Sequence, residues 1–114
     1  KMKRSFLQDT VTGKRYDLTA LAEENDDGIS IGRIGKGNDI GLGLENVLQE
    51  DKNSAGRISR HHATIKYLKS FYIKDHSTNG TRVNNRDVEE EFLLSHGDKI
   101  WLSTYGPLIF EEEY

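Results

Sequence analysis

The sequence contains no cysteine, a single proline and no long apolar run. Without cysteine the chain can form no disulfide and thiol chemistry is excluded, which suits a reducing compartment. No apolar stretch approaches the roughly 18 residues that a membrane-spanning helix needs, and nothing at the N-terminus is typical of a signal peptide. We therefore expect an intracellular protein without a membrane partner, cytoplasmic or, if the source is eukaryotic, nuclear.

An excess of basic residues is also lacking, since 16 Lys and Arg stand against 19 Asp and Glu, a net charge of −3. A general nucleic-acid binder usually carries a basic excess and aromatic side chains for base stacking, so this balance argues against a nucleic-acid partner. The acidic residues crowd at 23–27, 89–91 and 111–113. The basic ones gather around Arg33, Lys36, Arg57, Arg60, Lys66 and Lys69.

The 114 residues suffice for one hydrophobic core but not for two, so we expect a single domain over residues 1–114. Because Lys1 precedes Met2, we expect the chain to carry the remnant of a tag or to be excised from a longer protein. No internal repeat, low-complexity tract or linker divides it.

Short strands punctuated by glycine are the main structural signal. The segments with strand character are 5–7, 15–18, 28–32, 62–68, 71–75, 81–84, 99–103 and 108–110. Several short strands at this spacing predict an all-β sandwich or barrel, and no room is left for the crossover helices of a parallel sheet. Residues 18–24 are compatible with a short helix that makes a connecting turn, and residues 44–56 with an extended loop. The predicted core residues are Ile40, Ile65, Ile73, Val83, Ile100 and Leu102.

Three polar segments carry the functional signal: Gly32-Arg33, the run 57–65 (Arg-Ile-Ser-Arg-His-His-Ala-Thr-Ile), and the run 75–81 (Asp-His-Ser-Thr-Asn-Gly-Thr). Each places small polar or cationic side chains beside a predicted strand. A phosphate dianion needs hydroxyl donors, guanidinium forks and backbone N–H groups, and these segments contain all three. Taken singly, each segment is also explained as a surface turn, and Asn79-Gly80 alone predicts a hairpin with positive φ.

In this order, the three segments resemble the forkhead-associated (FHA) domain, a phosphothreonine-reading β-sandwich, over about residues 29–102. The resemblance implies a sandwich of two largely antiparallel sheets, of the FHA/SMAD-like kind, with ligand loops at one end. It implies that the phosphopeptide is contacted by Arg33, Ser59, Arg60, Thr78 and Asn79. It also implies that Gly32, His62 and Gly80 support the site structurally. We expect Gly32 to let the chain turn sharply so that Arg33 can reach the loop.

The resemblance further implies a partner protein that carries phosphothreonine, in signalling downstream of Ser/Thr kinases. Arg57, two residues before Ser59, is the candidate for selecting the side chain at position +3 of the ligand, where a cation would favour an acid. The alternative is a docking module of the same fold that needs no phosphate. The sequence identifies neither the partner nor the oligomeric state.

An enzyme is disfavoured by the spacing of the polar residues. His61 and His62 are adjacent at a predicted strand start, so they point to opposite faces and are poorly placed to chelate one metal. No His-Glu-x-x-His pattern, glycine-rich phosphate loop or Gly-x-Ser-x-Gly elbow is present. We therefore expect no catalytic residues, no metal and no cofactor.

Overall fold

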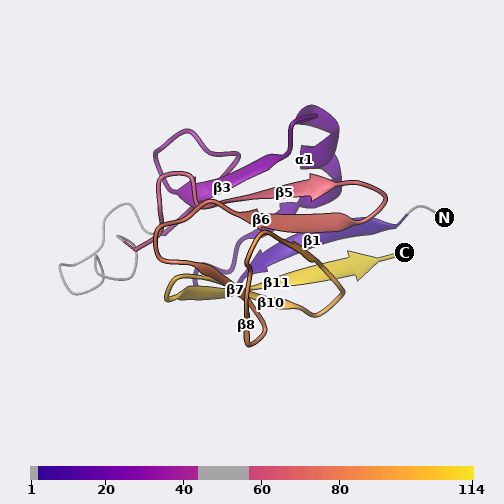
Figure 1. Cartoon of the computed structure of the whole chain (residues 1–114). Coiled ribbons are helices and arrows are strands. Elements are labelled where there is room, and N and C mark those ends of the chain that lie inside the picture. Colours follow the sequence, from indigo (N-terminus) through magenta and orange to yellow (C-terminus); the bar gives the residue numbers. More distant parts are fainter. Residues whose placement is uncertain (1–2, 44–56) are drawn as a thin grey trace.

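Two β-sheets stack on one another in the computed structural model, which describes residues 3–43 and 57–114 (Figure 1). The six-stranded sheet has the order β2-β1-β11-β10-β7-β8, and the five-stranded sheet has the order β4-β3-β5-β6-β9. The strands of the first are β1 (Arg4–Asp9), β2 (Arg15–Asp17), β7 (Thr81–Val83), β8 (Arg86–Asp87), β10 (Lys99–Leu102) and β11 (Tyr105–Glu113). Those of the second are β3 (Ile29–Arg33), β4 (Ile40–Leu42), β5 (Ala63–Tyr67), β6 (Phe71–Asp75) and β9 (Glu91–Leu93).

Antiparallel pairing dominates both sheets, and in the described part of the chain only β3 and β4 pair in parallel. The prediction of an all-β sandwich of two largely antiparallel sheets is confirmed. All eight predicted strands are present within a few residues of their expected bounds, but β4, β8 and β9 were not predicted. These three have two or three residues each, too few for an alternating pattern to stand out.

Residues 18–24 form a helix, α1 (Leu18–Glu24), so this connection is more regular than a turn. Asp17 caps its N-terminus, because the Asp17 side chain accepts a hydrogen bond from the backbone N–H of Ala20 at 3.0 Å. The part of the chain that the structure describes contains no helix long and apolar enough to cross a membrane. The loop expected over residues 44–56 lies outside the described residues.

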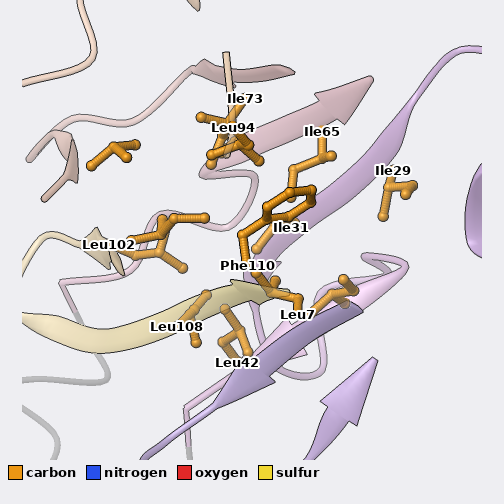
Figure 2. Packing of buried hydrophobic residues seen from close by; sticks show 14 of the residues in the cluster. Leu7, Ile29, Ile31, Leu42, Ile65, Ile73, Leu94, Leu102, Leu108 and Phe110 are labelled. Atoms are coloured by element: carbon orange, nitrogen blue, oxygen red, sulfur yellow. The ribbon is translucent and has the colours of Figure 1, made fainter. Parts of the chain in front are cut away.

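The core lies between the sheets, where inward-facing residues alternate along the strands (Figure 2). All six predicted core residues are fully buried. Phe110 lies among Leu7, Ile31 and Ile65, and its ring meets that of Phe71 edge to face at 5.9 Å. Tyr67 follows the alternation of Ala63 and Ile65 but is 56% exposed, because it lies where β5 leaves the core for the turn to β6.

The strand register brings three connections together at the end of the sandwich away from the termini (Figure 1). Ile31 pairs with Ala63, and Ala63 pairs with Asp75. Residues just after β3, just before β5 and just after β6 must therefore share one edge. These are the three polar segments of the sequence.

Candidate functional site

The segments 57–61 and 76–79 run antiparallel past one another and touch at three successive levels. At the first level, the side-chain amide of Asn79 donates to the carbonyl of Arg57 at 3.2 Å. At the second, the backbone N–H of Thr78 donates to the Ser59 hydroxyl oxygen at 3.2 Å. At the third, the rings of His61 and His76 stack with centroids 5.0 Å apart. We call these contacts the outer, middle and inner rungs.

The middle rung orients the Ser59 hydroxyl as a donor. Its oxygen already accepts from Thr78, so its proton is available for an acceptor in the site. The backbone N–H of Ser59 is engaged elsewhere, because it donates to Nδ1 of His62 at 3.0 Å. A ligand oxygen would therefore meet the Ser59 side chain and not this backbone group.

Arg33, the last residue of β3, is tied to the segment opposite it. Its backbone N–H donates to the carbonyl of Ser59, and its Nε donates to the carbonyl of Ile58, each at 3.0 Å. These two bonds fix the start of the side chain and the plane of the guanidinium. Arg33 lines the hollow together with Ser59 and Thr78.

Gly32 is required for a reason different from the one predicted. It lies within β3, and its φ is not in the left-handed region, so it makes no sharp turn. A Cβ at this position would lie 2.1 Å from the Arg60 carbonyl oxygen and 2.6 Å from Nδ2 of Asn38. Only glycine lets β3 and the segment after Arg57 approach this closely.

His62 bridges the two segments beneath the rungs and is fully buried. Nδ1 accepts from Ser59 N–H, so the ring proton is on Nε2, which donates to the Gly80 carbonyl at 3.0 Å. Burial lowers the pKa of His62, against smaller opposing effects of the Gly80 bond and Asp75. The neutral ring therefore holds both segments at neutral pH.

Asn38 is a second bridge between segments of the site. Its Nδ2 donates to the carbonyls of Arg60 at 2.6 Å and Arg33 at 3.3 Å. Its Oδ1 lies 3.3 Å from Nδ1 of His61. It thus joins the β3–β4 connection to the segment that carries Ser59.

The connection from β6 to β7 is stabilised internally around one carboxylate. Oδ1 of Asp75 accepts from the hydroxyls of Ser77 at 2.6 Å and Thr81 at 2.7 Å, and the Ser77 hydroxyl accepts from Gly80 N–H at 2.7 Å. Gly80 has φ +95°, a conformation that glycine adopts without strain. The prediction of a hairpin here is wrong, because β6 and β7 belong to different sheets and the turn crosses between them.

The hollow over the rungs has a volume of about 480 Å³ and is strongly cationic in its lining. All five residues expected to contact a phosphopeptide line it, together with Arg57. The lining residues are Arg33, Arg57, Ser59, Arg60, His61, His76, Thr78 and Asn79. None of these carries a carboxylate, so the site suits an anion with several acceptor oxygens.

Two comparisons with known proteins bear on this arrangement. The family model of the FHA domain matches residues 29–103, which is most of the chain and includes all three polar segments. The chain belongs to the FHA domain family. A search of curated proteins found no match.

Solved FHA structures agree in fold. The FHA domain in a study of phosphothreonine-dependent FHA interactions is 29% identical, with a TM-score of 0.70 and 95% coverage of each chain. Mycobacterium tuberculosis EmbR, solved with a low-affinity phosphopeptide, is 28% identical with a TM-score of 0.70. That match covers 95% of this chain but 24% of EmbR, so the chain spans about a quarter of that protein's length. The FHA domain of Chlamydia trachomatis CT664 is 25% identical, with a TM-score of 0.66 and coverage of 97% and 98%.

Two residues of this FHA site, His61 and His76, were missed at the sequence level. They are 15 positions apart, and each lies next to a motif residue whose role is more apparent. Only the β5–β6 register, which places Ala63 opposite Asp75, reveals that the residues beyond them meet. Within the described residues, no group of three or more His, Cys, Asp or Glu side chains could hold a metal ion.

A second hollow, of about 560 Å³, lies at the other end of the FHA fold. Its floor contains Ile29, Ile65 and Phe71, and its rim carries side chains of both charges. No arginine is among its described lining residues, which instead include the carboxylates Glu23, Asp26 and Asp27. The chemistry for a phosphate is therefore concentrated at the loop end.

Proposed function

We propose that this FHA domain binds phosphothreonine in a partner protein and thereby recruits that partner in Ser/Thr kinase signalling. The observation that carries the proposal is the middle rung, where Ser59 and Thr78 are hydrogen-bonded and line one hollow with Arg33, with no carboxylate among the described lining residues. A phosphothreonine brings about −1.5 to −2 charges and three acceptor oxygens, which match these donors in sign and number.

In this proposal Arg33, Ser59 and Thr78 contact the phosphate, Arg60 approaches it from the rim, and Asn79 holds the peptide backbone. His62 and Gly80 support the loops and touch no ligand atom. FHA domains are binding modules, and we propose that this chain likewise has no catalytic activity.

The magnitudes favour a switch that depends on the phosphate. A hydrogen bond to a charged group contributes roughly 1.5–3 kcal/mol, so two or three of them separate phosphorylated from plain peptide by several kcal/mol. Micromolar affinity corresponds to about −8.2 kcal/mol. Loss of the phosphate should therefore bring binding close to undetectable.

The test is a titration with matched fluorescent peptides that carry Thr, phosphoserine or phosphothreonine. The unmodified protein should bind the phosphothreonine peptide with roughly micromolar affinity and the Thr peptide not measurably. Arg33→Lys keeps the charge but loses the fork, so we expect at least about tenfold weaker binding. Arg86→Ala, at an exposed arginine outside the hollow, is the matched control and should bind normally.

Failure of every peptide in a degenerate phosphothreonine library would contradict the proposal. It would favour instead a docking module of the same fold that needs no phosphate.

Arg57 extends the proposal to the choice of ligand sequence. Its backbone carbonyl is held by Asn79, while its exposed side chain lines the outer end of the hollow. A peptide with Asp or Glu at +3 should bind more tightly than one with Ile, and Arg57→Gln should remove the difference. Equal affinities of the unmodified protein for the two peptides would contradict this role.

A further inference from the structure

The side chains of the inner rung, His61 and His76, have no role in the proposed phosphate contacts. His61 and His76 are exposed, line the same hollow as Arg33 and Ser59, and stack at an interplanar angle of 22°. They lie on the far side of the middle rung from Arg57 and Asn79. A phosphate on the middle rung would therefore have Arg57 on one side and the histidine pair on the other.

The described lining of the hollow is cationic beyond Arg33. It also carries Arg57 and Arg60, and no carboxylate is among the described lining residues. One phosphothreonine brings at most about two negative charges. A ligand with a further anionic group would therefore suit these guanidinium groups better than one with a single phosphate.

The bonds of Asn38 determine which atoms of the inner rung donate and which accept. Because Nδ2 of Asn38 donates to two carbonyls, its Oδ1 is an acceptor, so Nδ1 of His61 carries a proton. Nε2 of His61 then faces the hydroxyl of Thr64 at 3.4 Å, and the same hydroxyl lies 2.9 Å from Nε2 of His76. Thr64 is nearly buried, so its hydroxyl fixes both rings from below.

This chain can accommodate a protonated His76 without leaving a donor unpaired. Thr64 donates its single proton to His61 and accepts one from Nε2 of His76. The second N–H of His76, at Nδ1, makes no hydrogen bond within the described residues and is available to a ligand.

The charged surroundings of His76 also favour an anion. Burial, then His61 and Lys74, and more weakly Lys66, lower the pKa of His76, while Asp75 opposes them. Three of the four charged or titratable neighbours therefore repel a proton on this ring, and Arg60 adds positive charge at the rim. An anion bound at the inner rung would relieve that repulsion.

We propose that His61 and His76 form a second anion subsite, which binds an acidic or phosphorylated side chain of the same ligand through Nδ1–H of His76. The subsite rests on the proposed function, since it presupposes a phosphothreonine on the middle rung. With Arg57 facing position +3, the second anion belongs to a residue that precedes the phosphothreonine. The preferred ligand is thus a segment that is acidic, or phosphorylated a second time, on its N-terminal side.

The test scans one extra anion through positions −4 to −1 and +1 to +3 of a phosphothreonine peptide, in two series with Glu and with phosphoserine. At one position before the phosphothreonine, Glu should tighten binding about fivefold, and phosphoserine by more because it carries more charge. A gain in both series identifies a general anion subsite, and a gain for phosphoserine alone narrows it to a second phosphate. No gain at any preceding position overturns the proposal.

The variant that isolates the subsite is His76→Phe, which retains a ring for stacking but has no N–H. The measured quantity is the ratio of affinities with and without the extra anion, and it should fall to about one. His96→Asn is the matched control, because it removes a histidine that bonds the backbone of β11 outside the hollow. That variant should keep the ratio. Equal weakening of both peptides by His76→Phe, with the ratio unchanged, would show a structural role only.

Proton uptake on binding also distinguishes an anion subsite from a purely structural role of His76, which predicts no such uptake. Binding of the Glu-bearing peptide should protonate His76, so the affinity ratio should rise as pH falls from 7.5 to 6.5, where Glu itself does not titrate. Calorimetry in buffers of different ionisation enthalpy measures the uptake directly. Uptake no greater than that of the peptide without Glu would overturn the proposal, whereas failure of every phosphothreonine peptide to bind would contradict the proposed function itself.

Discussion

The imidazole of His62 is wholly buried, and each of its nitrogens bonds a different segment of the site. Burial lowers the pKa of His62, so the folded protein takes up the proton that would charge this imidazole less readily than the unfolded chain does. Its contribution to stability is therefore present above about pH 6.5, the ordinary histidine pKa, and is lost as the pH falls below that value.

We accordingly expect the melting temperature to fall between pH 7.5 and pH 5. His62→Gln should reduce the free energy of unfolding at pH 7.5 by about 1–3 kcal/mol, because one loop bond is lost and a buried group is left unpaired. Thermal unfolding followed by circular dichroism at several pH values measures both effects. The His62→Gln protein should show a shallower pH dependence, and a dependence as steep as that of the unmodified protein would contradict the role of His62.

The atoms around Gly32 leave no room for a side chain. A methyl group there would overlap the Arg60 carbonyl oxygen, so Gly32→Ala must push the segment 57–61 away from β3. We expect a loss of about 1–3 kcal/mol in stability, typical of overpacking, and weaker phosphopeptide binding as well. Denaturant unfolding and peptide titration check the two. Unchanged stability would show that the approach of β3 to Arg60 is looser than described.

A side chain of the β3–β4 connection links it to the segment that carries Ser59. The Asn38 side chain donates to the carbonyls of Arg33 and Arg60. Asn38→Ala should therefore weaken phosphopeptide binding by about tenfold. The reason is that the segment carrying Ser59 loses a hydrogen bond that orders it for the ligand. Because Asn38 lies at the surface edge, the melting temperature should change little. An affinity within twofold of the unmodified protein would contradict this bridging role.

Some strands and connections could be predicted from the sequence, and others could not. The spacing of several short strands predicted an all-β sandwich or barrel. The resemblance to the FHA domain then implied two largely antiparallel sheets with the three polar segments at one end. The crossing of β6 to β7 between sheets was mistaken for a hairpin, because Asn79-Gly80 signals a positive φ and says nothing of which sheet follows. The inner rung could not be predicted either, since the meeting of His61 and His76 depends on strand register and not on local pattern.

Across the whole molecule, the first and last strands hold the chain together. β1 pairs with β11 over six residues, so the two ends of the sequence are adjacent in the six-stranded sheet. Buried residues from both sheets form one apolar cluster, in which the fully buried Leu7 of β1 and Phe110 of β11 take part. We propose that residues 1–114 are a single domain that unfolds in one cooperative step.

Trp101, the only tryptophan, reports on β10, while far-UV circular dichroism reports on all strands. The urea midpoints measured by the two probes should coincide. Midpoints that differ beyond error would contradict a single cooperative unit.

The polar ends of this sandwich differ in chemistry, and the central claim is that phosphothreonine binds at the end where β3 stops and β5 starts. The most direct measurement is backbone amide chemical-shift mapping during titration with a phosphothreonine peptide. The account predicts saturable shifts at Arg33, at residues 57–61 and at 76–80, with none for the same peptide carrying Thr. Shifts confined to the hollow around Ile29, Ile65 and Phe71, or no shifts with any phosphothreonine peptide, would contradict it.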